Sequence, residues 1–354
     1  MDTDSRRRVL DASAHRQPDR TPAYCGRIDA LDHWRQAFHA ADEEELRSRF
    51  RLDLRKAPYK GLFRVEDGMT IWGTSDDWDS GYNVRTGGFP LAGAETVGDV
   101  ERHPWPDAGA VDYRELRRRN ERLDQRFATI LSLGWQPPFC TLLDLFGMER
   151  ALVLLHENPS MVEAALAHIE AFLIPEMNAA MDACADLVQF YWCGDDFSTQ
   201  RGLMMSPQTW RRFFKPFYGR MFQAIKDHGL SVWFHSCGTF QHVLPDLVDM
   251  GMDVWETVQV HLEGNDPARL KADYGGHLTF FGAISCQTTL PFGTPEEVRR
   301  EVRERVRVLG KGGGYICGPD HHIKPDVPAA NVVALFWAAR SYAQAGCTQG
   351  TRSV

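Results

Sequence analysis

The sequence predicts a single α/β domain built as a closed (β/α)8 TIM barrel, and three observations predict it. Short apolar runs in the second half of the chain each lead into small or polar residues and then into a helical pattern, which is typical of parallel β/α units. These runs are nearly all apolar rather than alternating, as expected for strands covered on both faces. The 354 residues can hold a barrel of ~250 residues with additions. We therefore expect one domain over residues 1–354.

The first third of the chain predicts an N-terminal helical extension followed by an irregular insertion. Residues 6–12 and 31–50 have apolar side chains at helical spacing, and residues 23–25 can begin a strand. Residues 51–108 are rich in Gly, Pro, Trp and Asp, with short β-like pieces such as 69–72. We interpret this stretch as an irregular excursion or lid.

From about residue 110 strands and helices alternate. Residues 112–126, 148–155 and 160–183 have helical patterns, and residues 127–132 form a short strand. Five further strands are expected at 187–192, 230–234, 252–255, 278–281 and 314–316.

Composition excludes several classes of protein. The chain has 40 basic and 48 acidic side chains and a net charge of −8, which argues against a general nucleic-acid binder. Its apolar runs are shorter than the ~20 residues that span a bilayer, so no membrane association is expected. The N-terminus lacks the apolar core of a signal peptide, so we expect a cytoplasmic protein. The eight cysteines are then expected as free thiols or metal ligands.

Chemistry-bearing residues follow the predicted strands, where barrel enzymes carry their active sites. His235 and Cys237 leave one strand, and side chains two apart in extended backbone point the same way. Cys317, at the end of another strand, can add a second thiolate. One imidazole and two thiolates favour a tetrahedral Zn²⁺ with an open fourth position. Such an ion deprotonates a bound thiol and leaves it nucleophilic, which is what a methyl acceptor requires.

Other strand-end residues keep two interpretations. Asp195, Asp196 and Glu256 could be catalytic, as proton-transfer or substrate-contact groups, and each of them could also be the fourth zinc ligand. Either aspartate could instead cap a helix. Glu256 and Gln259 could bind substrate or close strand-end backbone groups. Cys286 could be a spare zinc ligand but is favoured as a buried thiol. His321 could contact substrate, support the metal ligands or order its loop. Trp135 and Trp192, near strand ends, could line an apolar cleft or belong to the core.

At these residues the sequence resembles the uroporphyrinogen decarboxylase superfamily, and within it the zinc-dependent, corrinoid-linked methyltransferases of the methylcobamide:coenzyme M type. The resemblance implies one TIM barrel. It covers most of the chain and rests on Arg8–Ala12, Gln17–Pro22, Gly194–Asp196, His235–Gly238, Leu244–Leu247, Gly293–Val298, Gly312–Ile316, Pro325–Pro328 and Asn331.

The methyltransferase branch is marked by His-x-Cys and a later Cys as zinc ligands, which map onto His235, Cys237 and Cys317. The decarboxylases carry an Arg-rich segment near the N-terminus, and residues 25–29 here lack it. The resemblance therefore implies a zinc methyltransferase that moves a methyl group between a corrinoid on a partner protein and a small-molecule thiol or methylated substrate. Whether the chain forms a homodimer stays open.

Two other functions are weighed against this one. A metal-free decarboxylase or lyase on the same scaffold would use Asp195 or Asp196 to contact a small carboxylated substrate. A non-catalytic corrinoid or porphyrin carrier is disfavoured, because the chain lacks the Asp-x-His-x-x-Gly signature of a cobalamin-binding module.

Overall fold

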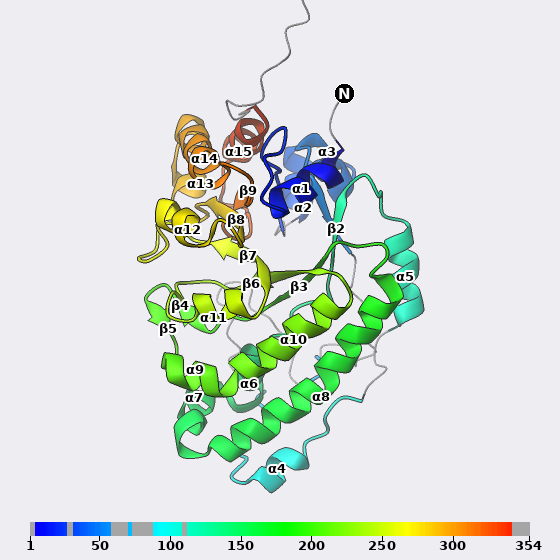
Figure 1. Cartoon of the computed structure of the whole chain (residues 1–354), viewed down its shortest axis with the longest axis vertical. Coiled ribbons are helices and arrows are strands. Elements are labelled where there is room, and N and C mark those ends of the chain that lie inside the picture. The colour runs from blue at the N-terminus through cyan, green and yellow to red at the C-terminus, as the bar shows by residue number, and fades with distance from the viewer. Residues whose placement is uncertain (1–3, 27–30, 58–69, 73–87, 108–111, 342–354) are drawn as a thin grey trace, which may run out of the picture.

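A curled sheet of seven parallel strands forms the centre of the protein. The computed structural model describes residues 4–26, 31–57, 70–72, 88–107 and 112–341 (Figure 1). The strand order is β1-β2-β3-β6-β7-β8-β9, and every neighbouring pair is parallel. The strands are β1 (Leu54–Lys56), β2 (Ala128–Leu131), β3 (Phe190–Gly194), β6 (Ser231–His235), β7 (Met252–Val258), β8 (Thr279–Ile284) and β9 (Tyr315–Pro319). A separate hairpin of β4 (Ser198–Thr199) and β5 (Gly202–Leu203) follows β3.

The two edges of this sheet are linked by the short extended stretch expected at residues 23–25. The backbone N–H of Cys317 donates to the carbonyl of Pro22 (2.8 Å), and that of Tyr24 donates to the carbonyl of Cys317 (3.0 Å). On the other side, the N–H of Asp53 donates to the carbonyl of Ala23 (2.8 Å). The prediction of a closed eight-stranded barrel is thus confirmed in part, as a curled seven-stranded parallel sheet with helices around it.

Side chains alternate between the two faces of the strands, and this alternation divides the core in two. Trp192, Trp233, Phe281 and Ile316 belong to a cluster enclosed by the curled sheet. The side chains between them along each strand pack outward against the helices in a second, larger cluster. Because the strand period is two residues, every inward-facing position fixes its neighbours as outward-facing.

Long helices cover the outer face of the sheet. Figure 1 shows α8 (Pro159–Cys184) and α10 (Lys215–Asp227) side by side, and α14 (Pro295–Leu309) next to α15 (Ala329–Ser341). No helix in the described ranges has the length and apolar composition needed to cross a bilayer. The remaining helices after residue 112 are α5 (Tyr113–Glu121), α6 (Pro138–Phe146), α7 (Met148–Glu157), α9 (Pro207–Phe213), α11 (Leu244–Asp249), α12 (Pro267–Tyr274) and α13 (Thr289–Phe292).

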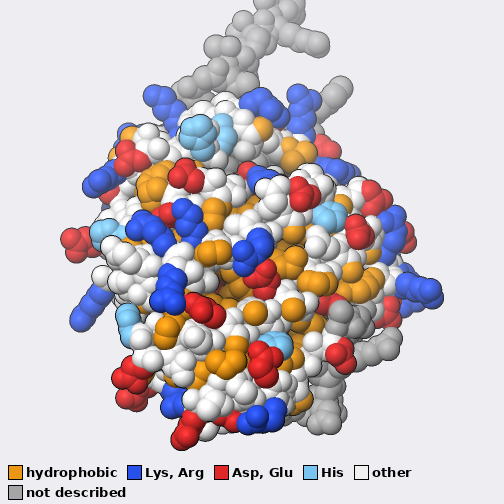
Figure 2. Space-filling view, turned by 60° about the horizontal axis from the view of Figure 1, so that its bottom comes forward, with side chains coloured by type: hydrophobic (Ala, Val, Ile, Leu, Met, Phe, Trp, Pro, Cys, Tyr) orange, Lys and Arg blue, Asp and Glu red, His pale blue; other side chains and the backbone are white. Residues whose placement is uncertain are grey.

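Acidic and basic side chains are mixed on the outside of these helices. Arg212 of α9 pairs with Glu163 of α8 at 2.8 Å, and Arg220 of α10 pairs with Glu170 of α8 at 2.5 Å. Figure 2 shows the same mixture of charges over one face of the molecule. Exposed pairs of this kind contribute little to stability, and they leave no large field of one sign on that face.

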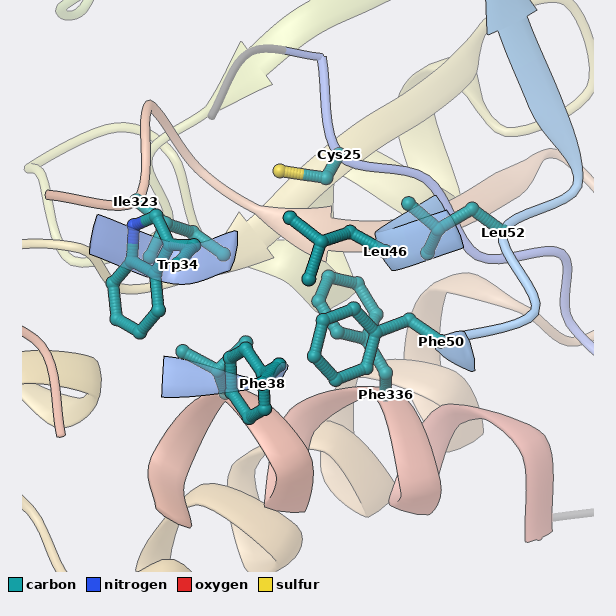
Figure 3. A pocket seen from close by; sticks show the side chains of 9 residues that line it. Cys25, Trp34, Phe38, Leu46, Phe50, Leu52, Ile323 and Phe336 are labelled. Atoms are coloured by element: carbon teal, nitrogen blue, oxygen red, sulfur yellow. The ribbon is translucent and has the colours of Figure 1, made fainter. Parts of the chain in front are cut away.

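The N-terminal helical extension is present, with one difference from the expectation. Residues 31–50 form two helices, α2 (Leu31–Ala37) and α3 (Glu43–Arg49), because Asp42 caps the second one by accepting from the N–H of Glu45 (2.8 Å). These helices pack on α15 around a small apolar cavity of about 10 Å³, which has room for one water molecule at most (Figure 3). The side chains shown there are Cys25, Trp34, Phe38, Leu46, Phe50, Leu52, Ile323 and Phe336, with Val332 completing the lining.

The helix α1 (Ser5–Ser13) is joined to the sheet by the buried carboxylate of Asp53. Asp53 has no exposed surface and accepts from Arg8 Nη1 (2.7 Å), Arg20 Nη1 (2.8 Å), Ser5 Oγ (2.8 Å) and the backbone N–H of Ala23 (2.9 Å). One side chain thus fixes α1 and the linking stretch against the start of β1.

Part of the irregular excursion at 51–108 belongs to the sheet. β1 lies within it, and α4 (Val97–Glu101) follows near its end. Residues 70–72 are not a strand in the structure, and residues 58–69 and 73–87, where the lid was expected, lie outside the described residues. The strand escaped prediction because it has only three residues, Leu54–Lys56, and two of them are charged.

Candidate functional site

Three potential metal ligands meet at the carboxyl ends of β6 and β9. His235 is the last residue of β6, Cys237 follows two positions later, and His321 lies just beyond the end of β9. One ligand atom from each of them lies within 4.8 Å of the others. The Sγ of Cys237 is 3.5 Å from Nε2 of His235. Among the described residues this is the one group of His, Cys, Asp and Glu side chains with such spacing.

This donor set fits a zinc ion. Imidazole nitrogen and thiolate sulfur are the ligands that Zn²⁺ prefers. A tetrahedral ion bound at about 2.1 Å to nitrogen and about 2.3 Å to sulfur places the two donors about 3.6 Å apart. The separation of 3.5 Å between His235 and Cys237 agrees with that edge length. Three protein ligands would leave one coordination position for a substrate.

Glu256 orients the His235 ring. Its Oε1 lies 3.3 Å from His235 Nδ1, and its Oε2 accepts from Trp192 Nε1 (2.9 Å) and from Trp233 Nε1. Burial would raise the pKa of Glu256, but the hydrogen bond and charge of His235 hold it below its ordinary value. With Nδ1 engaged, Nε2 of His235 faces Cys237. Glu256 was expected as a catalytic group, and the structure instead shows it bound behind a candidate ligand.

Gly194 makes the close approach of β3 and β6 possible at this point. A Cβ added to Gly194 would lie 2.6 Å from the carbonyl oxygen of His235 and 2.7 Å from its Cβ. Real Cβ atoms essentially never come this close to other atoms. A side chain at position 194 would therefore displace His235.

Asp196 lies beside two of the three donors. Its Oδ1 accepts from the backbone N–H of Cys237 (2.9 Å) and is 3.8 Å from His235 Nε2. The structure therefore brings Asp196 to the cluster, as the sequence predicted. The carboxylate holds the turn that carries Cys237 and lies beside the His235 ring.

The neighbouring Asp195 is turned away from the cluster and caps a helix. Its carboxylate has no exposed surface and accepts from the backbone N–H of Phe139 (2.6 Å) and Cys140 (3.0 Å) at the start of α6, and from Tyr218 Oη (2.7 Å). Burial raises the pKa of Asp195 to about 7 in spite of these hydrogen bonds. The expectation of a catalytic Asp195 is corrected by this geometry, because both oxygens are already occupied by protein donors.

Cys317 does not reach the three donors, which corrects its expected role as a ligand. The inward-facing residue of β9 is Ile316, so Tyr315 and Cys317 point to the outer face of the sheet. Cys317 is fully buried there, and it contacts Tyr315 and lies near the charge of Glu301. Burial raises the pKa of this thiol to about 12, so it stays protonated. His321, expected at most as a support or substrate contact, takes the third place in the cluster.

Gln259 supports the backbone of the site rather than facing a ligand. It is buried, and its Oε1 accepts from the N–H of Gly238 (2.7 Å), directly after Cys237. Its carbonyl accepts from Asn265 Nδ2 (3.1 Å). Of the two interpretations of Gln259, the structure favours the closing of strand-end backbone groups.

Trp192 forms part of the wall next to the cluster, together with Trp135, which was also expected near a strand end, and Lys56, which the sequence did not indicate. Its ring centre is 5.8 Å from that of His235, and the ring of Trp135 lies edge-on to His235 at 5.5 Å. Lys56, at the end of β1, places Nζ 3.8 Å from the centre of the Trp192 ring. Lys56 was hidden inside the irregular stretch, and Trp135 follows β2 without any recognisable motif.

A family model described as Uroporphyrinogen decarboxylase (URO-D) matches residues 114–342, which is more than half of the chain. The chain belongs to the uroporphyrinogen decarboxylase family. The match begins in α5 and ends with α15, so it contains all three donors of the cluster.

Members of this family with curated names are distant relatives. A uroporphyrinogen decarboxylase of Chlorobium luteolum is 25% identical over 193 residues, covering 51% of this chain and 49% of the relative. One of Thermus thermophilus is 29% identical over 159 residues, covering 44% of this chain and 41% of the relative. The chain thus spans about half the length of the curated relatives that it matches.

A solved structure shares the fold of this chain over nearly its whole length. A methyltransferase from Methanosarcina mazei superposes with a TM-score of 0.68, covering 96% of this chain and 99% of that one. The sequences are 18% identical, so the likeness is one of fold. The reaction must therefore be argued from the residues of the site.

Proposed function

We propose that this protein is a zinc-dependent methyltransferase that moves a methyl group between a corrinoid and a thiol or another heteroatom of a small substrate. The observation that carries the proposal is the convergence of His235, Cys237 and His321, whose nitrogen and sulfur donors suit zinc. Bound there, the ion would lower the pKa of a substrate thiol and keep its sulfur nucleophilic.

The chain's own residues would prepare the site for this reaction. Glu256 fixes the His235 ring, and Asp196 fixes the turn that carries Cys237. The rings of Trp135 and Trp192 would shield the bound sulfur from water on one side. Thr257 Oγ1 lies 3.7 Å from the Sγ of Cys237. A hydrogen bond from this hydroxyl would reduce the negative charge on the Cys237 thiolate.

We assign the corrinoid to a separate partner protein. The sequence lacks the cobalamin-binding signature of a corrinoid carrier. The donors lie at the carboxyl end of the strands, where enzymes of this fold receive their substrates. The methyltransferase from Methanosarcina mazei, which shares the fold, supports the choice of reaction class.

A metal-free decarboxylase is the second candidate, because the curated relatives are uroporphyrinogen decarboxylases. The charges of the site argue against it. Asp196 and Glu256 lie next to His235, and two carboxylates at the bottom of a site repel the carboxylate groups of such a substrate.

Metal analysis of the purified wild-type protein, joined to one activity assay, tests the proposed function. We expect about one zinc per chain, and demethylation of methylcobalamin in the presence of 2-mercaptoethanol, followed by its visible spectrum. Removal of zinc with a chelator should abolish the reaction, and zinc should restore it. A folded protein without zinc that decarboxylates a small carboxylated substrate would favour the second candidate.

Replacing Glu256 with glutamine should weaken zinc binding about 10- to 100-fold, which is the usual cost of losing a carboxylate behind a metal-bound histidine. The amide would still fill the space between Trp192, Trp233 and His235, but it lacks the negative charge that makes the imidazole a better donor. Competition with a chromogenic chelator measures the change. Glu176→Gln is the matched control, since Glu176 is also buried but lies in α8, where it accepts from Tyr113.

A further inference from the structure

A second histidine with a buried acid lies at the same end of the sheet and outside the ligand cluster. His261 follows β7, and Asp320 directly follows β9, next to His321. His261 Nδ1 is 3.6 Å from Asp320 Oδ2. The two side chains come from loops that are far apart in sequence, and the expectations from the sequence did not include His261.

Asp320 is buried in a way that requires a cationic or donating neighbour. It has no exposed surface, and its Oδ1 accepts from the backbone N–H of Cys286 (2.8 Å). Its Oδ2 is buried and has no hydrogen-bond partner among the described residues. A buried carboxylate oxygen without a donor is costly, so the nearby Nδ1 of His261 is the group that must carry a proton toward it.

The other nitrogen of His261 faces the side chain of Gln287. The ring is 25% exposed, whereas Asp320 is fully enclosed. Nε2 lies 3.2 Å from Oε1 of Gln287, an exposed side chain on the loop after β8. Gln287 Oε1 also accepts from Gln200 Nε2 (2.9 Å) on the β4–β5 hairpin, so Gln287 keeps a partner when it leaves His261. Nε2 can therefore be freed without leaving an unsatisfied group behind.

We propose that His261, oriented by Asp320, is the proton-transfer residue of this site. The inference rests on the proposed function and adds the residue that handles the substrate proton. For a thiol substrate, the S–H bond breaks, its electron pair stays on sulfur, and the proton passes to His261 Nε2 and then to solvent. Asp320 acts through His261 as a positioning residue: it holds the proton on Nδ1, so that Nε2 carries the free lone pair.

The surrounding groups suit a base that works near neutral pH. The close contact with the Asp320 carboxylate raises the pKa of His261 above its ordinary value, against the effect of burial. Gln287, on the loop after β8, also favours the protonated ring, and the charge of Glu301 in α14 adds to this. Removing the charge of Asp320 should therefore lower the pKa of His261.

The experiment combines histidine NMR with kinetics on the zinc-loaded protein. The His261 signal is assigned as the one lost in His261→Gln, and its pKa is measured in wild type and in Asp320→Asn without metal. We expect a pKa above the ordinary value in wild type and a decrease of about one unit or more in Asp320→Asn. In the methylcobalamin and 2-mercaptoethanol assay, His261→Gln should lose about 100-fold in kcat/KM with unchanged zinc content, as for loss of a general base. Added imidazole should restore part of the activity of His261→Ala.

Each outcome supports or overturns the inference. His156→Gln on the exposed surface of α7 is the control and should match wild type in every readout. If wild type binds zinc and is active, and His261→Gln keeps full activity, the inference about His261 is overturned while the proposed function stands. An ordinary His261 pKa that does not change in Asp320→Asn also overturns it. A wild type that binds no zinc overturns the proposed function, and the inference with it.

Discussion

Replacing His321 with alanine should remove most of the bound zinc, whereas replacing Cys317 with alanine should leave zinc binding intact. His321 is one of the three side chains whose donor atoms lie within 4.8 Å of each other. Its loss leaves two protein ligands, and we expect an affinity loss larger than the ~10- to 100-fold that removal of an outer partner causes. Metal content by mass spectrometry and competition with a chelator measure both variants.

Cys317→Ala is a demanding control because Cys317 was the ligand that the sequence favoured. It is fully buried on the outer face of β9, so its loss creates a small cavity and should lower stability by about 1–2 kcal/mol. Its zinc content should nevertheless equal that of wild type. Zinc lost from Cys317→Ala and kept by His321→Ala would show that the assigned ligand set is wrong.

The difference between these two residues shows what a single sequence can predict about this site. Trp233 of β6 faces the inside of the curled sheet. His235 and Cys237 lie two and four residues after it, so they are expected on the same inner face. The His-x-Cys pair was therefore predictable from strand parity. The same rule excludes Cys317, because Ile316 is inward-facing on β9. The sequence placed Cys317 correctly at the end of a strand, but the prediction did not consider which face of that strand the side chain occupies.

His321 and His261 could not be predicted in this way. Both lie in loops beyond the ends of their strands, where backbone direction depends on contacts with other loops. The Asp320–His321 turn is held by Cys286, whose backbone N–H donates to Asp320 and whose thiol donates to the carbonyl of His321 (3.5 Å). Such contacts between β8 and β9 loops leave no periodic signal in the sequence.

The fold was easier to predict than the site because it depends on long repeating patterns. Apolar runs that alternate with helices predicted β3 and β6–β9 at nearly their observed positions. The strand β1 was missed: it is short, and Arg55 and Lys56 are charged. Arg55 is nevertheless buried, since Glu44 of α3 and the carbonyls of Leu52 and Leu54 accept its donors. Tertiary pairing thus overrode local composition.

Replacing Asp53 with alanine should destabilise the protein by about 3–5 kcal/mol, the usual effect of removing one partner of a buried ion pair. Arg8 and Arg20 would lose a shared counter-charge, and Arg8 is only 2% exposed. The backbone N–H of Ala23 would also lose its acceptor in a buried position. Urea unfolding followed by tryptophan fluorescence measures the change as a lower midpoint at similar slope.

Asp11→Ala is the matched control on the same helix. Asp11 pairs with Arg16 and Arg7, whose side chains are 63% and 76% exposed, so its removal should cost less than about 1 kcal/mol. Equal midpoints for the two variants would mean that Asp53 is not what fixes α1 to β1. If the prediction holds, Asp53→Ala should also loosen the Pro22–Tyr24 stretch, because Asp53 holds Ala23 while the same stretch pairs with Cys317 of β9. Amide hydrogen exchange should then rise at Tyr24 and Cys317 before it rises in β6 and β7, which lie at the centre of the sheet.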